Sequence, residues 1–209
     1  MNKLITIFAV IILLSSCFGK HNSDAPQAAV NEQNTENRNL TGDTTKIDLR
    51  KSTVHWKGTK MRGTGKHEGE IEFIEGYFVT ENNQLKGGSF TIDMLTISVT
   101  DIPQHEPVPR KRLNDHLKSS DFFDVEKFPT SQFNITNVKK ITSDSLMISG
   151  NLTLKDITKN IEFGANYKGK LFTTKFTFDR FKWNIVYEGN LADKTLVDKD
   201  IELTIDLMM

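Results

Sequence analysis

The chain has 209 residues, enough for one or at most two domains. Its 27 Lys and Arg side chains balance 27 Asp and Glu, and this zero net charge argues against a nucleic-acid-binding protein, which needs a basic surface. A single cysteine excludes an internal disulfide, and 14 Phe against 3 Tyr and 2 Trp favour a dry, apolar interior.

Residues 1–16 have the pattern of a signal peptide. Lys3 gives a positive start, and "LITIFAVIILL" (4–14) is an apolar run too short to span a bilayer, which takes about 20 residues. "LSSC", ending at Cys17, resembles a bacterial lipobox. This resemblance implies that Cys17 is lipidated and anchors the protein in the bacterial cell envelope, facing the periplasm or the cell surface. The alternative is an ordinary secretory peptide with an incidental cysteine.

The segment 17–45 follows as a polar stretch. It is rich in Asn, Thr, Gln and Ala and has almost no large apolar residues. Such a segment cannot bury enough surface to offset the entropy lost on ordering. We therefore expect a flexible tether of ~28 residues, with a reach of roughly 30 Å, that holds a folded domain, residues 46–209, off the membrane.

From residue 46 onward, apolar and polar residues alternate with a period of two, which is typical of half-buried strands. The pattern indicates roughly eight strands, drawn from the stretches "STVHWKG" (52–58), "GEIEFIEGYFVT" (69–80), "SFTIDM" (89–94), "SQFNIT" (131–136), "SLMISGNLTLK" (145–155), "NIEFGANY" (160–167), "LFTTKFTFD" (171–179), "RFKWNIVY" (180–187) and "DIELTIDLM" (200–208). After Met94 the phase shifts, so that Leu95, Ile97 and Val99 become the apolar set and a bend is expected. One-sided strands without βαβ alternation predict an all-β antiparallel barrel or sandwich.

One helix interrupts the strands. The stretch "PRKRLNDHLKSSDFF" (109–123) begins with Pro109, which suits a first helical turn, and repeats Leu113, His116, Leu117 and Ser120 at helical spacing. We expect one short helix that caps an end of the barrel.

Three stretches are similar to segments of one known family. "LNDHLKSSDFFDVEKFPTSQF" (113–133), "GNLTLKDITKNIEF" (150–163) and "FDRFKWNIVYEG" (178–189) follow the order and spacing of segments in the YceI-like family, and the first is the most specific. Asp156 and Asn184 stand where the family commonly has glycine, and Asp and Asn tolerate the backbone angles of turns. The resemblance covers about residues 46–209. It implies an eight-stranded antiparallel lipocalin-like barrel whose apolar channel holds a polyisoprenoid or other long-chain lipid.

An eight-stranded barrel is near the size at which the interior is either filled by side chains or holds one small ligand. From the residues alone, the alternating apolar set is ordinary core, and the family resemblance favours a lipid-binding channel instead. The candidate lining residues are Trp56, Phe73, Phe90, Ile92, Met94, Leu117, Phe122, Phe123, Phe133, Leu152, Phe163, Phe176, Phe178 and Trp183.

A charged lipid head group would require cations at the barrel mouth. The Gly-rich stretch "GTKMRGTGKHEG" (58–69) supplies Arg62, Lys66 and His67 as head-group candidates, with Lys60 beside them. The alternative is a solvated hairpin. A second candidate patch, Arg110, Lys111 and Arg112, is more typical of surface.

Catalytic motifs are absent from the sequence. The histidines have no metal-ligand spacing, and there is neither a nucleophile elbow nor a phosphate-binding loop. Adjacent Asp115 and His116 on a helix do not face each other, which argues against a dyad. We expect no enzyme activity, no catalytic residues, no metal and no cofactor other than the lipid ligand.

The sequence therefore predicts a lipid-anchored barrel that sequesters or carries a long-chain isoprenoid or related amphiphilic lipid. Its expected partners are this ligand and, through the N-terminal anchor, a membrane, but not nucleic acid. A ligand-free structural or envelope-stress lipoprotein with a packed barrel is the alternative. A minor enzyme acting on a bound lipid is a third. The sequence leaves open the oligomeric state, including a homodimer.

Overall fold

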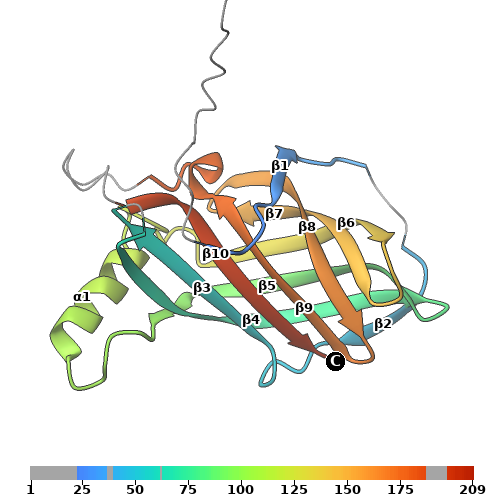
Figure 1. Ribbon diagram of the computed structural model, residues 1–209, viewed down its shortest axis with the longest axis horizontal. Coiled ribbons are helices and arrows are strands. Elements are labelled where there is room, and N and C mark those ends of the chain that lie inside the picture. The colour runs from blue at the N-terminus through green and yellow to red at the C-terminus, as the bar shows by residue number, and fades with distance from the viewer. Residues whose placement is uncertain (1–22, 37–39, 62, 187–196) are drawn as a thin grey trace, which may run out of the picture.

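Eight strands form a closed antiparallel barrel in the computed structural model, which describes residues 23–36, 40–61, 63–186 and 197–209 (Figure 1). These strands are β3 (Thr53–Lys60), β4 (Gly65–Glu81), β5 (Gln84–Val99), β6 (Thr130–Lys140), β7 (Ser145–Leu154), β8 (Ile157–Lys168), β9 (Leu171–Asp179) and β10 (Val197–Met208). Each pairs with the next in the chain from β3 to β9, and β10 closes the ring between β9 and β3. The prediction of an eight-stranded antiparallel barrel is confirmed.

The alternating pattern places one side of each strand inside. β7 shows this most simply, because every second residue from Leu146 to Leu154 is buried. Gly150 occupies one of these inward positions, where a Cβ would lie only 2.3 Å from the Phe133 ring. The inward residues of all eight strands contribute to a single apolar core.

A bend in β5 follows Met94, as the shift in alternation predicted. Between the pairs Glu72–Asp93 and Glu70–Ser98, β5 has extra residues that bulge out of the ladder. The Asp93 carboxylate accepts the Leu95 N–H (3.0 Å) and stabilises the bend. Ile97 and Val99 are buried as expected, but Leu95 is 50% exposed, because it lies in the bulge rather than in the new inward set.

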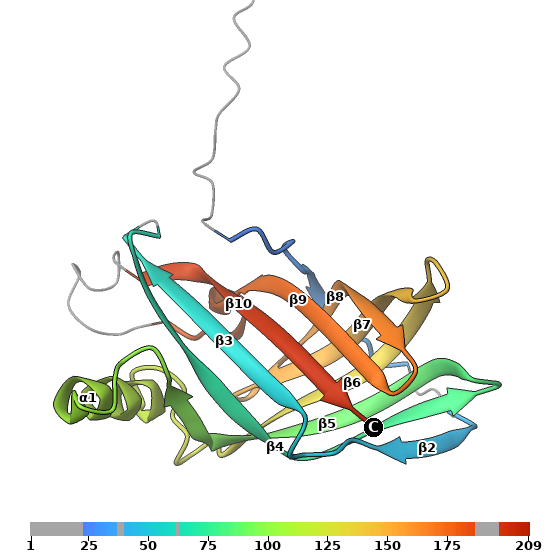
Figure 2. The same ribbon diagram turned by 60° about the horizontal axis from the view of Figure 1, so that its bottom comes forward.

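The helix α1 (Pro107–Lys118) lies at one end of the barrel and confirms the expected short helix (Figures 1 and 2). It starts two residues before the predicted Pro109, with Pro107 at a first-turn position where proline is favoured. Leu117 is buried, and the Asn114 side chain accepts the Val99 N–H of β5 (2.8 Å). This hydrogen bond and the buried leucine fix the helix to the barrel end.

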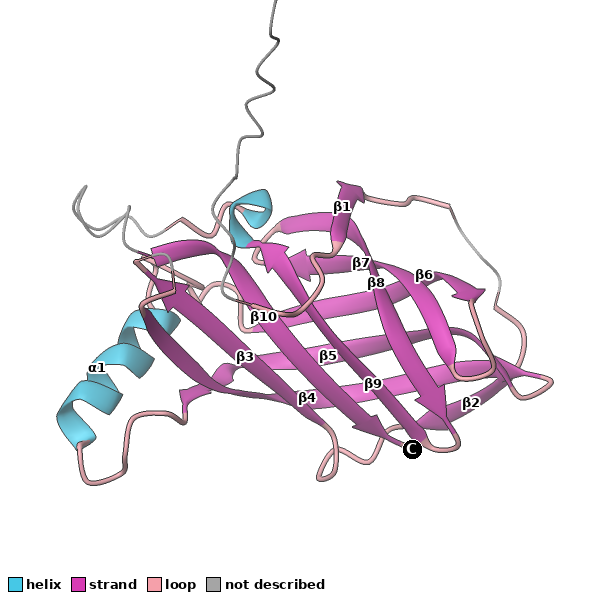
Figure 3. Ribbon diagram, in the orientation of Figure 1, coloured by secondary structure: helices cyan, strands magenta, loops and turns pink. Residues whose placement is uncertain are grey.

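The stretch "RFKWNIVY" is not a strand, and this part of the prediction is wrong. Arg180–Trp183 form a 3-10 turn, η1, seen as the second helical segment in Figure 3. The Asp179 carboxylate accepts the Phe181 N–H (3.0 Å), and Asn184 has the left-handed conformation that ends the turn. These local bonds outweigh the alternating pattern. Tyr187 lies outside the described residues.

Two short strands in the segment predicted as a tether pair with the barrel. β1 (Ala29–Glu32) is antiparallel to β8, and β2 (Asp43–Lys46) is antiparallel to the far half of β4. The expectation of a flexible tether is therefore wrong for residues 23–36 and 40–45. The polar composition of this segment does not prevent it from being ordered, because backbone hydrogen bonds to open strand edges stabilise β1 and β2.

β1 lies at the place where the barrel wall is least complete. β8 and β9 pair directly only over Ala165–Lys168 and Leu171–Thr174. Beyond that point, β1 pairs with residues 159–162 of β8, and the chain just before it bonds to β9. The Ala28 N–H donates to the Thr177 carbonyl (2.8 Å), and the Thr177 N–H donates to the Pro26 carbonyl (2.9 Å). The N-terminal segment thus fills the seam between β8 and β9. Cys17 lies outside the described residues.

Candidate functional site

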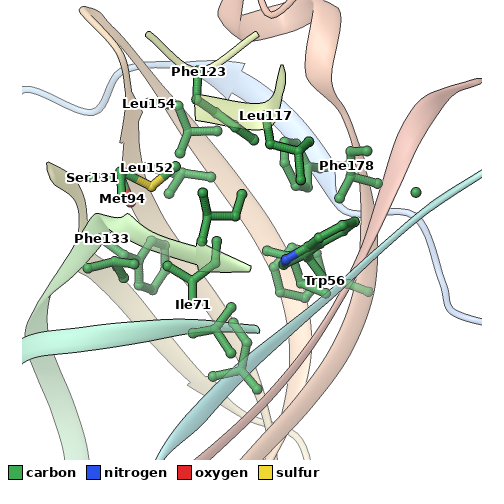
Figure 4. A pocket seen from close by; sticks show the side chains of 18 of the residues that line it. Trp56, Ile71, Met94, Leu117, Phe123, Ser131, Phe133, Leu152, Leu154 and Phe178 are labelled. Atoms are coloured by element: carbon green, nitrogen blue, oxygen red, sulfur yellow. The ribbon is translucent and has the colours of Figure 1, made fainter. Parts of the chain in front are cut away.

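A cavity of about 210 Å³ lies inside the barrel. This volume exceeds the ~150 Å³ of an apolar cavity that holds a benzene-sized guest, and is below the ~300–1,000 Å³ of sites for drug-sized ligands. Its lining is formed by residues from all eight barrel strands, from α1 and from the segment after it. Figure 4 shows apolar side chains converging on this space from several directions.

The structure brings nearly all of the predicted lining residues together. Trp56, Phe73, Phe90, Ile92, Met94, Leu117, Phe122, Phe123, Phe133, Leu152, Phe163, Phe176 and Phe178 all line the cavity. Phe163 and Phe176 are stacked, with ring centroids 4.2 Å apart, and form part of one wall. Lipid binding by these residues stays a prediction, since the structure holds no ligand.

Trp183 does not line the cavity. It is fully buried in η1, its indole N–H donates to the Leu152 carbonyl (3.0 Å), and its ring meets Phe178 edge-on at 5.3 Å. Its role is to pack behind the cavity wall. The alternation in "RFKWNIVY" predicts a strand with Trp183 facing inward, and the 3-10 turn places the ring elsewhere.

Sequence reasoning missed several lining residues, although most follow the same alternation. They include Val54, Ile71, Ile135, Leu154, Ile161, Phe172, Ile201, Leu203, Ile205 and Leu207 on strands, and Leu113 and His116 on the helix. Inward alternation along each strand was the available signal. It does not separate residues that touch the cavity from residues that only pack around it.

The two ends of the barrel differ. At the far end from α1, Phe78 is fully buried and packs against Phe90 (5.0 Å), Phe172 (5.3 Å) and Tyr167 (6.2 Å between ring centroids). Burial raises the pKa of the Tyr167 phenol, which keeps it neutral. This aromatic cluster fills the far end, so the cavity is reached from the α1 end.

Three basic side chains stand at the α1 end of the cavity: Lys60, Lys66 and His67. Two of them already face carboxylates, because Lys66 Nζ lies 3.2 Å from Glu68 Oε2 and His67 Nδ1 lies 3.0 Å from Asp101 Oδ2. The mouth is therefore polar and mixed in charge rather than strongly cationic. Arg62, the remaining head-group candidate, lies outside the described residues.

The second basic patch does not reach the cavity lining. Arg110 donates to the Ile102 carbonyl (3.0 Å), and Lys111 pairs with Asp115 (2.5 Å) one helical turn away. Asp115 thus faces Lys111, while the neighbouring His116 lines the cavity. The two side chains point to different surroundings, as expected for adjacent residues on a helix. Among the residues that the structure describes, no three His, Cys, Asp or Glu side chains group as a metal site.

Arg180 is a buried cation behind the mouth. It is 1% exposed, and its guanidinium donates to the carbonyls of Asp198 (3.2 Å), Val197 (3.2 Å) and Ile185. Burial lowers the pKa of this guanidinium, while the charges of Asp179 and Asp198 oppose that effect. These bonds run to backbone carbonyls and tie η1 to the start of β10.

Residues 46–209 match the YceI-like domain. The chain belongs to the YceI-like family. Its curated relatives include a UPF0312 protein of Pseudomonas putida (strain W619), 26% identical over 117 residues that cover 56% of this chain and 57% of the relative. Protein YceI of Salmonella arizonae is 36% identical over 92 residues, which is 44% of each chain. The chain thus spans about half the length of the curated relatives it matches.

Solved structures share the YceI-like fold. BcnA of Burkholderia cenocepacia superposes with a TM-score of 0.64 at 19% identity, covering 78% of this chain and 99% of BcnA. A polyisoprenoid binding domain from Saccharophagus degradans superposes with a TM-score of 0.59 at 11% identity, covering 80% of this chain and 97% of that domain. At these identities the similarity shows the fold alone. Among the described residues, the helices are too short and too polar to cross a membrane.

Proposed function

We propose that this YceI-like barrel binds and carries or sequesters a long-chain amphiphilic lipid of the isoprenoid type. The observation that carries the proposal is an apolar cavity closed at one end by aromatic rings and bordered at the other by polar side chains. The tail would enter from the α1 end and the head group would stay near Lys60, Lys66 and His67. The Saccharophagus neighbour, described as a polyisoprenoid binding domain, supports the choice of lipid class.

The gain in free energy comes from burying the tail. Each buried CH2 contributes about 0.8 kcal/mol before the costs of ordering and association are subtracted. A cavity of about 210 Å³ is too small for a long isoprenoid in full, so the barrel holds one end of the chain unless it widens on binding.

A binding role fits the lining better than catalysis does. The titratable side chains that line the cavity, Lys60, Lys66, His67 and His116, lie at its α1 end, away from the apolar interior where the tail would sit. We propose that the chain acts as a carrier and not as an enzyme.

We further propose that Cys17 is lipidated and holds the barrel at the bacterial envelope. Because residues from Ser23 onward lie against the barrel, only the stretch between Cys17 and Ser23 separates the anchor from the fold. The six residue-to-residue steps from Cys17 to Ser23 span at most ~20 Å, less than the ~30 Å expected of the longer tether. The barrel would therefore sit close to the membrane that supplies its ligand.

The anchor is tested with Cys17→Ser in bacterial cells. We expect the wild-type chain in the membrane fraction and labelled by radioactive palmitate, and the variant in neither. A wild-type chain that remains unlabelled and is released in soluble form would overturn the anchor.

Native mass spectrometry of the full chain carrying Cys17→Ser, followed by solvent extraction, tests the ligand. We expect a stoichiometric lipid with a long apolar tail. Leu152→Trp, which fills the cavity, should abolish the adduct, while the matched change Leu95→Trp at an exposed position outside the lining should leave it. A mass free of ligand, unchanged after incubation with polyprenols and polyprenyl phosphates, would favour the packed structural barrel instead.

A further inference from the structure

Trp56 carries a buried hydrogen-bond donor that the fold does not use. Its side chain is 7% exposed, and its indole N–H has no partner among the residues that the structure describes. Buried donors are almost always paired, and leaving one unpaired is costly. Trp183 gives the contrast within the same chain, because its buried indole N–H donates to the Leu152 carbonyl. The unpaired donor therefore calls for a partner from outside the fold.

The cavity is the place where that partner would sit. Trp56 lines the cavity, and Figure 4 shows its nitrogen edge turned toward the interior, on the side of Ile71. The surrounding wall is apolar, so no neighbouring side chain competes for the donor. Because the nitrogen itself is almost completely covered, a ligand in the cavity would reach the N–H by shifting the lining side chains next to it.

Gly69 leaves the space that the indole occupies in this orientation. It faces Trp56 across the β3–β4 ladder, and a Cβ at residue 69 would lie 2.7 Å from Trp56 Cζ2 and 1.8 Å from the Ser98 carbonyl oxygen. Only a residue without a side chain lets the ring lie against β4 at this point. The close contact of the indole with β4 thus depends on glycine at residue 69.

We propose that the Trp56 indole N–H donates a hydrogen bond to an oxygen atom of the bound lipid, and so selects long-chain lipids that carry an acceptor oxygen inside the barrel. This inference rests on the proposed lipid-binding function and narrows it to amphiphilic lipids with an oxygen on the chain itself, which the tail of an unsubstituted polyprenol lacks. Trp56 is four residues from Lys60 at the end of β3, which places the acceptor roughly 13 Å from the rim along the strand, at ~3.3 Å per residue.

The acceptor should be a neutral oxygen, such as a carbonyl, hydroxyl or ether. A carboxylate or phosphate at this depth would lose its hydration among apolar side chains, and a single indole donor does not replace it. The cations that could stabilise such a charge, Lys60 and Lys66, lie at the mouth. A charged head group therefore stays outside while the neutral oxygen meets Trp56.

The test uses octadecanoic acid and its positional oxo derivatives, with the ketone at successive carbons of the chain. These probes share length and carboxylate and differ in the acceptor alone. For one or two ketone positions we expect the wild-type chain to bind the oxo acid with an advantage over octadecanoic acid that is roughly three- to tenfold larger than in Trp56→Phe. Phe178→Leu is the matched control, because it trims the same lining but keeps the donor, and should weaken all probes alike.

Indole N–H resonances give a second readout on the unmutated binding site. The chain has two tryptophans, so ¹⁵N-tryptophan labelling yields two indole signals. The favoured oxo acid should move the Trp56 signal downfield and slow its exchange with water beyond the effect of octadecanoic acid, while the Trp183 signal stays in place. This measurement holds even if a substitution at Trp56 impairs folding.

The outcomes separate the two proposals. If octadecanoic and oxo acids bind but Trp56→Phe changes nothing and the indole signal is the same with both, the role of Trp56 is overturned and the carrier function stands. If none of these acids and no polyprenol binds, the carrier function itself fails, and the inference about Trp56 fails with it.

Discussion

Among the described residues, the hydrogen bonds of the buried Arg180 guanidinium run to backbone carbonyls and not to a carboxylate. Its three backbone acceptors lie in two segments, Ile185 just after η1 and Val197 and Asp198 at the start of β10. The ring of Phe122 lies 5.5 Å from its guanidinium carbon, so the same side chain also contacts the segment that follows α1. The guanidinium holds five N–H donors in a fixed, extended fork that reaches carbonyls in separate segments, whereas a lysine ammonium has three donors on a single nitrogen.

We expect Arg180→Lys to lower the free energy of unfolding by about 3 kcal/mol, because it keeps a buried charge but loses most of the bonds that compensate it. Urea unfolding followed by fluorescence measures the loss. Arg180→Met, which preserves packing but removes the charge, separates the two contributions. A lysine variant within 0.5 kcal/mol of wild type would contradict the structural role.

Glu202 joins the N-terminal segment to the barrel through its charge. It lies on the outer side of β10, where its carboxylate accepts a hydrogen bond from Ser23 Oγ. The Nζ atoms of Lys57 and Lys175 each lie 3.1 Å from the same carboxylate. Burial acts to raise the pKa of this carboxyl, but the hydrogen bonds from Ser23, Lys175 and Lys57 outweigh burial and hold the pKa below its ordinary value of 4.5.

Because the pKa of Glu202 is lower in the folded state, its stabilisation is present above about pH 4.5 and is lost as the pH falls through the folded-state value. We expect Glu202→Gln to show a smaller loss of stability on acidification than wild type, together with lower stability at pH 7. Thermal unfolding between pH 3 and 7 measures this. Glu75→Gln, at an exposed position of β4, should run parallel to wild type. Parallel curves for wild type and Glu202→Gln would rule out this linkage.

At the scale of elements, β1 completes the barrel wall. Ala28 is 5% exposed and belongs to the core, whereas the neighbouring Ala29 faces solvent. We expect Ala28→Glu to release the segment, because a carboxylate cannot remain at that position, and to speed amide hydrogen exchange at residues 159–162 and at Thr177. Ala29→Glu should change exchange little. Equal protection in both variants would mean that the segment does not seal the seam.

The sequence predicts the barrel far better than it predicts this seam. Alternation defines β3 to β10 because inward side chains must be apolar wherever one face of a strand is buried. β1 has no such signal, since a short strand that only fills a gap needs backbone bonds and few inward residues, here Val30 and, just before the strand, Ala28. The same limit explains the error at 180–187, where a side chain, Arg180, bonds to the backbone of a distant segment.

The candidate site shows the same division. Its apolar lining follows from alternation and from the excess of phenylalanine, so most lining residues could be named in advance. The unpaired indole N–H of Trp56 could not, because an unmet hydrogen bond is visible only when every neighbouring strand has been placed. Nothing in the sequence distinguishes the two tryptophans, but in the fold the Trp183 N–H donates to the Leu152 carbonyl and the Trp56 N–H has no such partner among the described residues.

At the scale of the whole molecule, the barrel is a container with one open end. α1 and the β3–β4 turn lie at the same end of the barrel (Figure 2). They border the mouth, and the rings around Phe78 fill the opposite end. A closed end sets a limit to how much of a straight chain can be buried. We therefore expect the affinity of the barrel for a ligand to depend strongly on the length of the ligand's chain.

We expect the affinity for n-alkyl carboxylic acids to rise with length, by at most about fourfold per added CH2, and then to level off when the tail meets the aromatic end. Isothermal titration with saturated acids of 8 to 20 carbons locates the break. Phe78→Leu should shift the break to longer chains, because it removes part of the ring that fills the far end, while Phe181→Leu, at an exposed site outside the lining, should not. An affinity that rises without a break to 20 carbons would mean that the barrel opens at the aromatic end. An affinity independent of length would mean that the tail does not enter the cavity, and the carrier proposal would fail on that result.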